Sequence, residues 1–187
     1  MLLDEQIVAI ERAFGAAAIP HAFGGAQALA YYGPIRATHD IDLNVFVSAS
    51  EAQGVLDSLG SLGAEVSNPG LLVLIERDEQ VRIFWDATPV DLFFAYDALH
   101  QSSMERRRAV DFYGDPIHIQ SAEDLMVYKA TFNRPKDWRD IAGMIFASPE
   151  PLDFDYVRTW LERIDDEERH RLDRLERLIE SGGADLD

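Results

Sequence analysis

Residues 39–47 alternate between apolar and polar side chains, a pattern typical of a strand with one buried face. The apolar positions are Ile41, Leu43 and Val45. The opposite face presents the carboxylates of Asp40 and Asp42 side by side. Two carboxylates that close repel each other unless they share a cation or a proton. The segment therefore predicts either a cation-binding strand or, as the alternative, an outer face that is simply solvated.

A third carboxylate, Asp91, interrupts the apolar run of residues 90–94. If Val90, Leu92 and Phe94 fill one face of a strand, Asp91 points the opposite way. Should this strand lie beside the one that carries Asp40 and Asp42, the three carboxylates converge. Such a trio can hold two metal ions for an in-line phosphoryl displacement. The alternative reading of Asp91 is a buried ion pair with an arginine.

The glycine pair Gly24-Gly25 follows a short apolar segment, residues 19–23, and precedes a segment with helical propensity, residues 26–32. Glycine lets the backbone approach a phosphate closely, and a helix that follows directs free N–H groups toward it. The order strand, glycine pair, helix, Asp-x-Asp strand therefore indicates a phosphate site next to a metal site. A simple turn is the alternative.

The remaining pattern predicts an α+β core over residues 1–120 and a helical region over residues 121–187, packed on the core as a single structural unit. Helices are expected at residues 3–14, 50–62 and 97–108. Strands are expected at residues 71–76, 81–85, 90–95, 110–113 and 116–119. In the C-terminal region, helices are expected to begin at Ser121 and to cover residues 136–146, 154–164 and 167–179, with a frayed tail at residues 181–187.

The chain has 187 residues, a formal net charge of -17 and no cysteine, which excludes disulfides and thiolate metal sites. It shows no signal-peptide pattern and no apolar run long enough for a membrane span, so a cytoplasmic location with no membrane partner is expected. So acidic a surface repels nucleic-acid phosphates, which disfavours tRNA as a partner. It favours a compact substrate or a basic partner.

Four segments together resemble the nucleotidyltransferase superfamily of the polymerase-β-like type, and most closely its AbiEii/AbiGii-type and minimal members. They are residues 24–25, 36–43, 121–129 and 134–141. The resemblance covers roughly residues 20–146. It implies a nucleotidyltransferase-fold mixed sheet flanked by helices, with a helical C-terminal part. Many such proteins carry Ser or Thr within or directly after the glycine pair, whereas this chain has Ala26.

The resemblance also implies roles for nine residues. Asp40 and Asp42 would bind Mg²⁺, or Mn²⁺ in its place, and Asp91 would complete a second metal site or deprotonate the acceptor hydroxyl. The nucleotide-binding residues would be Gly24, Gly25, Arg36, Thr38, Lys129 and Asp137. Among these, the glycines would cradle the phosphates, Lys129 would reach the triphosphate, and Asp137 would orient Lys129 or the nucleotide.

The expected activity is transfer of a nucleoside monophosphate from a nucleoside triphosphate to an acceptor hydroxyl on RNA, protein or a small molecule. Proteins of the resembling type include toxins of toxin–antitoxin systems, which implies a cognate antitoxin-like protein partner. They also include antibiotic-modifying enzymes. The alternative is a catalytically silent module of the same fold that binds a nucleotide or a protein partner.

Overall fold

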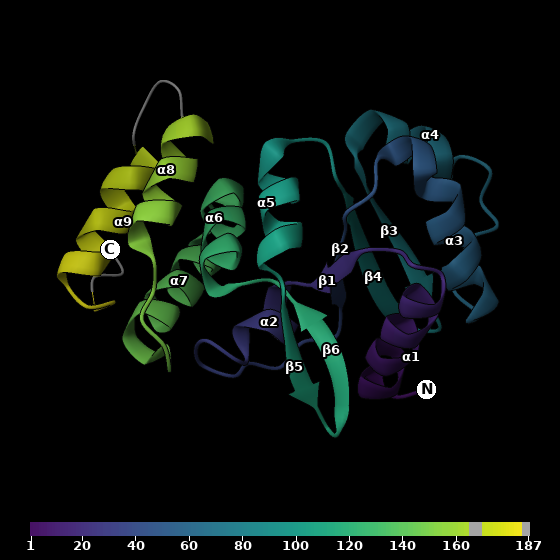
Figure 1. Cartoon of the computed structure of the whole chain (residues 1–187), viewed down its shortest axis with the longest axis horizontal. Coiled ribbons are helices and arrows are strands. Elements are labelled where there is room, and N and C mark those ends of the chain that lie inside the picture. Colours follow the sequence, from purple (N-terminus) through teal and green to yellow (C-terminus); the bar gives the residue numbers. More distant parts are fainter. Residues whose placement is uncertain (165–169, 185–187) are drawn as a thin grey trace. The chain divides into compact units, whose positions relative to one another are not determined.

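The structure is a computed structural model that describes residues 1–164 and 170–184 (Figure 1). The chain forms two compact units. The first consists of Met1–Gln27 and Ala37–Gln120. The second consists of Ala28–Arg36 and the described part of Ser121–Asp187.

The first unit is built on a six-stranded mixed sheet with the order β3-β4-β2-β1-β6-β5. The strands are β1 (His21–Phe23), β2 (Ile41–Val45), β3 (Gln80–Trp85), β4 (Thr88–Phe94), β5 (Arg108–Phe112) and β6 (Asp115–Ile119). β2 and β4 are parallel, as are β1 and β6, and the other neighbours are antiparallel. The mixed sheet with its helices confirms the expected α+β class.

The helices of the first unit are α1 (Leu3–Ala16), α3 (Ala52–Ser61), α4 (Leu71–Asp78) and α5 (Ala98–Arg106), with a 3-10 turn at Ala49–Glu51. α1 buries Ile7, Ile10 and Phe14, which share one face at helical spacing. The short helix α2 (Gly25–Leu29) spans the boundary between the units. The core of the sheet comes from the alternating positions of β2 and β4, where the apolar side chains are fully buried.

The strand predicted at residues 71–76 is wrong, because this segment forms helix α4. Only Leu71 and Ile75 are buried, four positions apart, while Val73 is 66% exposed. That spacing fits one face of a helix, whereas a strand would have buried alternate residues. Short apolar runs do not distinguish the two by periodicity alone. Glu79, in the left-handed region at φ 54°, ends the helix.

Several element boundaries also differ from the expectation. β2 begins at Ile41, so Asp40 lies in the bend before the strand. β4 begins at Thr88, after a two-residue turn in which Asp86 has φ 54°. Arg108 is the first residue of β5 and is not part of the preceding helix, which ends at Arg106.

The described residues of the second unit from Ser121 onward form α6 (Ala122–Phe132), α7 (Pro135–Ala147), α8 (Phe154–Ile164) and α9 (His170–Glu180). Ser121 caps α6, because its Oγ accepts a hydrogen bond from the Asp124 N–H at 3.1 Å. The helix expected at residues 167–179 is present from His170, and its first three positions lie outside the described residues, as do residues 185–187 of the tail. None of the described helices is long and apolar enough to cross a membrane.

Candidate active site

Asp42 and Asp91 lie directly beside each other on the parallel strands β2 and β4. Register partners on adjacent strands point to the same face of a sheet. Both carboxylates are partly exposed, whereas the flanking Ile41 and Leu43 are fully buried. The buried side chains therefore orient the two carboxylates toward the opposite, solvent-accessible face.

Asp40 is held at the entrance to β2 by two neighbours. The Thr38 hydroxyl donates a short hydrogen bond to Oδ1 of Asp40. The side chain of Gln27 donates from Nε2 to the Asp40 carbonyl oxygen at 2.9 Å. These contacts fix the backbone and the carboxylate of Asp40 although it precedes the regular strand.

The glycine pair lies against the polar face of β2. A Cβ at Gly25 would overlap Oδ2 of Asp42 and lie 2.5 Å from its Cγ, and Gly25 has φ +50°. A Cβ at Gly24 would lie 2.7 Å from Oε1 of Gln120 and 2.9 Å from Nδ2 of Asn44. Both glycines are thus required for close approach to side chains of the sheet, whether or not a phosphate also binds there.

Arg82 on β3 pairs with Asp91 through two hydrogen bonds, Nε to Oδ1 at 2.7 Å and Nη2 to Oδ2 at 2.6 Å. The hydrogen bonds and charge of Asp91 raise the pKa of Arg82, and the charges of Asp40 and Asp42 raise it further. The Arg82 guanidinium therefore interacts electrostatically with all three carboxylates. The pairing of Asp91 with an arginine is the alternative that the sequence left open, although Arg82 is more than half exposed.

In the second unit, Lys129 is buried and donates to Oδ2 of Asp140 at 2.6 Å. Its Nζ also lies 4.0 Å from Oδ1 of Asp137. Asp137 accepts from Arg134, with 2.6 Å between Nε and Oδ2. Arg36 reaches Asp140 at 3.4 Å. Lys129 and Asp137, the nucleotide-binding residues expected from the helical motif, are thus buried in an ion-pair network within this unit that includes the more exposed Arg134 and Arg36.

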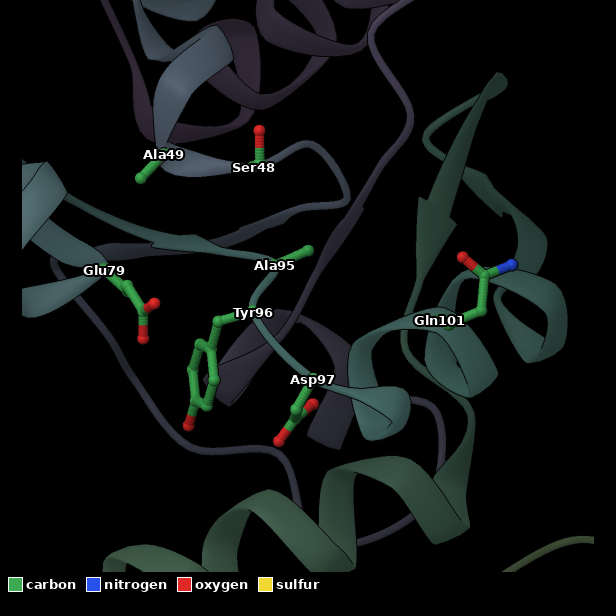
Figure 2. Close-up of a pocket in the computed structure, with 7 residues that line it drawn as sticks. All are labelled: Ser48, Ala49, Glu79, Ala95, Tyr96, Asp97 and Gln101. Carbon is green, nitrogen blue, oxygen red and sulfur yellow. The ribbon is translucent and has the colours of Figure 1, made fainter.

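A pocket of about 440 Å³ lies beyond the carboxyl ends of β2 and β4 (Figure 2). Its lining residues are Ser48, Ala49, Glu79, Ala95, Tyr96, Asp97 and Gln101. In Figure 2 the side chains of Glu79, Tyr96 and Asp97 extend in the same direction. Burial raises the pKa of Tyr96, and so do the charges of Asp97 and Glu79. Two carboxylates, those of Glu79 and Asp97, line the pocket, and such a lining suits a cationic group.

Two residues near the carboxylates, Arg82 and Gln27, are not among those predicted from the sequence. Arg82 could have been found from the hairpin: a two-residue turn at residues 86–87 places it opposite Asp91, as the β3–β4 register does. Assigning residues 86–89 to the turn hid this pairing. No local pattern points to Gln27, because its partner is a backbone carbonyl thirteen residues away.

No family model matches the sequence, and no curated protein matches it at a significant level. Solved structures do resemble it. The antibiotic-resistance factor ANT(2'')-Ia, in solution, is 16% identical with a TM-score of 0.55, over 96% of this chain and 92% of that one. The crystal structure of ANT(2'')-Ia in complex with adenylyl-2''-tobramycin is 14% identical with a TM-score of 0.53, over 96% and 95%.

An antigenic nucleotidyltransferase-like protein from Paracoccidioides brasiliensis is 17% identical with a TM-score of 0.50, over 93% of this chain and 92% of that one. The chain has a nucleotidyltransferase fold. This confirms the fold expected from the glycine pair, the Asp-x-Asp strand and the third aspartate. In this nucleotidyltransferase fold, Asp42 and Asp91 occupy neighbouring positions on the central strands β2 and β4.

Proposed function

We propose that this protein is a nucleotidyltransferase that moves a nucleoside monophosphate from a nucleoside triphosphate to an acceptor hydroxyl. The observation that carries the proposal is the side-by-side placement of Asp42 and Asp91, with Asp40 in the bend directly before the strand that carries Asp42. Gly25 supports it, since only a residue without a Cβ leaves room for the Asp42 carboxylate.

The donor set fits Mg²⁺, which prefers carboxylate oxygens together with substrate phosphates. Asp40 and Asp42 would hold it, and Mn²⁺ would suit the same oxygens. When bound, the ion would neutralise the triphosphate and the charge that develops on the leaving pyrophosphate. Thr38 and Gln27 keep Asp40 in place for this task.

In the proposed reaction, the acceptor oxygen forms a bond to the α-phosphorus while the bond from that phosphorus to pyrophosphate breaks. Asp91 takes the proton of the acceptor hydroxyl. Arg82 orients the Asp91 carboxylate through both of its oxygens, so the incoming hydroxyl must displace or share one of these contacts. Catalysis is otherwise a matter of positioning and charge stabilisation. Lys129 and Asp137 are proposed to serve the triphosphate.

The acceptor is proposed to be a compact cation that bears hydroxyl groups. Two observations support this: the acidic pocket around Tyr96 and the net charge of -17. The structural relative ANT(2'')-Ia was solved in complex with adenylyl-2''-tobramycin. The same charge disfavours tRNA as acceptor.

The test uses each common ribonucleoside triphosphate, radiolabelled at the α-phosphate, with Mg²⁺ and acceptors of three kinds: tobramycin, tRNA and total cell protein. Labelled tobramycin is the expected product. Asp42→Asn should lower the rate by about 100-fold or more, because a ligand of the charge-stabilising ion is lost. Asp57→Asn, the same change at an exposed position of α3, should leave it unchanged. Labelling that persists in Asp42→Asn would contradict the proposal.

A silent nucleotide-binding or partner-binding module is the second candidate. Two observations favour it: Arg82 holds Asp91, and Asp140 holds the buried Lys129. Calorimetry with a triphosphate and Mg²⁺ separates the candidates, since tight binding without any turnover supports the silent module. A role as the toxin of a toxin–antitoxin pair, with an antitoxin-like partner, stays a prediction from the resemblance.

A further inference from the structure

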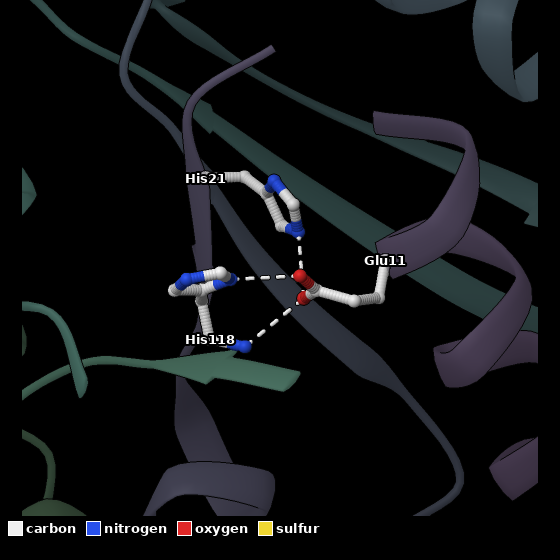
Figure 3. Close-up of side chains that lie close together, drawn as sticks. All are labelled: Glu11, His21 and His118. Carbon is white, nitrogen blue, oxygen red and sulfur yellow. Dashed lines mark hydrogen bonds and ion pairs between the residues drawn. The ribbon is translucent and has the colours of Figure 1, made fainter. Parts of the chain in front are cut away.

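Three side chains with metal-ligating atoms meet in the first unit, apart from the aspartates (Figure 3). Glu11 comes from α1, His21 from β1 and His118 from β6. Nε2 of His21 lies 3.0 Å from Oε2 of Glu11, and Nδ1 of His118 lies 2.7 Å from Oε1. The three ligand atoms all lie within 4.8 Å of one another. They are contributed by three elements, of which β6 is distant in sequence from α1 and β1.

The environment of His21 presents its Nε2 to this cluster. The ring is 4% exposed, and Nδ1 lies 2.9 Å from the carbonyl oxygen of Ile19. A carbonyl oxygen only accepts, so Nδ1 carries a hydrogen, and a neutral ring then keeps its lone pair on Nε2. A backbone carbonyl that fixes the far nitrogen in this way is the usual support of a metal-binding histidine.

Glu11 brings both of its carboxylate oxygens to the two histidines. Oε2 lies against Nε2 of His21 and also accepts a hydrogen bond from the backbone N–H of His118 at 2.9 Å, while Oε1 lies against Nδ1 of His118. The carboxylate is largely buried, at 13% exposure. A carboxylate oxygen and an imidazole lone pair that face each other in a buried position are two donor atoms that a metal cation between them would satisfy.

We infer that Glu11, His21 and His118 form a binding site for a divalent transition metal, with Zn²⁺ the best match. Two imidazole nitrogens and one carboxylate oxygen are ligands that Zn²⁺ binds at about 2.0–2.2 Å. Tetrahedral angles at such lengths separate donor atoms by about 3.3 Å, and each imidazole nitrogen already lies close to one oxygen of the same carboxylate, Nδ1 of His118 at 2.7 Å from Oε1 and Nε2 of His21 at 3.0 Å from Oε2. His118 is 38% exposed, which leaves a route for the ion and room for water as a fourth ligand.

This site is separate from the proposed catalytic one. His21 is the register partner of Val45, and Phe23 that of Leu43, so His21 shares the apolar face of β2 and lies opposite to Asp42. The chemistry differs as well, since oxygen-only ligands suit Mg²⁺ and imidazole suits Zn²⁺. Because the three ligands join α1 to β1 and β6, the ion would have a structural role in the first unit.

The inference is tested with the full chain after treatment with a chelator. Co²⁺ is added as a spectroscopic probe, because its visible absorption reports tetrahedral nitrogen and oxygen ligands, and Zn²⁺ is then used as a competitor. One equivalent of Co²⁺ should bind and be displaced by Zn²⁺. His118→Ala is the variant of choice, since its side chain is half-exposed and its loss should leave the fold intact. The affinity for Co²⁺ should fall by about 10-fold or more.

Two controls separate this site from others. His170→Ala removes an exposed histidine of α9 and should bind Co²⁺ like the wild type. Asp42→Asn removes a ligand of the proposed Mg²⁺ site and should also keep the Co²⁺ spectrum, so the outcome is independent of the proposed activity. If the wild-type protein binds no Co²⁺, the three side chains form only a hydrogen-bonded cluster, and the inference is overturned. Equal Co²⁺ affinity in wild type and His118→Ala would overturn it too.

Discussion

The carboxylate of Asp42 fills the space that a side chain at Gly25 would need. A Cβ there would lie 2.5 Å from Cγ of Asp42 and overlap one of its oxygens. The backbone at Gly25 is also in the left-handed region, which disfavours any residue with a Cβ. The same close contact therefore requires glycine at position 25 and positions Asp42, the candidate metal ligand.

Gly25→Ala should therefore impair activity more than it impairs folding. We expect a loss of about 1–2 kcal/mol in the free energy of unfolding from the left-handed backbone. Displacement of Asp42 should lower kcat/KM by about 100-fold. Gly54→Ala is the matched control, because a Cβ there would meet nothing within 4 Å in helix α3. Denaturant unfolding and nucleotidyl-transfer kinetics measure both effects. Full activity in Gly25→Ala would mean that the Asp42 carboxylate can take another position that still supports the reaction.

Asp91→Asn and Arg82→Gln should behave differently if Asp91 takes the acceptor proton. The first variant loses the base and should lower kcat by about 100-fold or more. The second loses only an orienting partner, so a reduction of about 10-fold is expected, with a change in stability of about 1 kcal/mol or less at this exposed pair. Arg77→Gln, which breaks the exposed Arg77–Asp78 pair, is the control. Equal losses of kcat in the two variants would indicate that Asp91 pairs with Arg82 and does not take the acceptor proton.

Lys129→Met should be costly, because among the described residues it leaves the buried Asp140 with the longer contact to Arg36 alone. Removal of one partner from a buried ion pair costs about 3–5 kcal/mol, and Asp140→Asn should cost a similar amount. The double variant Lys129→Met, Asp140→Leu should cost less than the sum, since no uncompensated charge stays buried. Chemical denaturation of the single and double variants gives the coupling energy. Additive costs would argue against a structural pair.

Tyr96→Ala should weaken binding of the acceptor without affecting binding of the nucleotide. The side chain contributes an aromatic wall to the acidic pocket and is 62% exposed, so its removal should not disturb the core. We expect KM for a cationic acceptor to rise by about 10-fold, in line with loss of a cation–π contact of about 1–2 kcal/mol. KM for the triphosphate should stay constant. Tyr113→Ala, in the exposed turn between β5 and β6, should change neither KM.

Stability of the second unit should depend on pH through Glu176. Hydrogen bonds from Arg158, at 2.6 and 3.0 Å, hold the pKa of Glu176 below its usual 4.5. A carboxyl group whose pKa is lower in the folded than in the unfolded protein stabilises the fold at a pH above its unfolded-state pKa. This stabilisation is lost as the pH falls through the folded-state pKa. Glu176→Gln should therefore lower the free energy of unfolding at neutral pH by less than about 1 kcal/mol, given the exposed pair, and have no effect in strong acid. Glu65→Gln, at an exposed position, is the control in the same titration.

The sequence by itself determined which side chains share a face. Alternation along residues 41–45 and 90–94 is local, because successive residues of a strand point to opposite faces wherever the strand lies. It therefore predicted that Asp42 and Asp91 face away from the core. The capping serine at position 121 and the one-faced apolar spacing of α1 are local in the same sense and were also predictable.

Only the tertiary structure decided which of these residues meet. The Asp42–Asp91 register and the approach of His118 to Glu11 depend on how separate strands and helices pair. Helix α4 illustrates the same limit, since its apolar run suits a strand equally well and only Leu71 and Ile75 found buried positions. Which strands and helices pair depends on contacts between residues that are far apart in the sequence. No window of neighbouring residues contains both partners of such a contact.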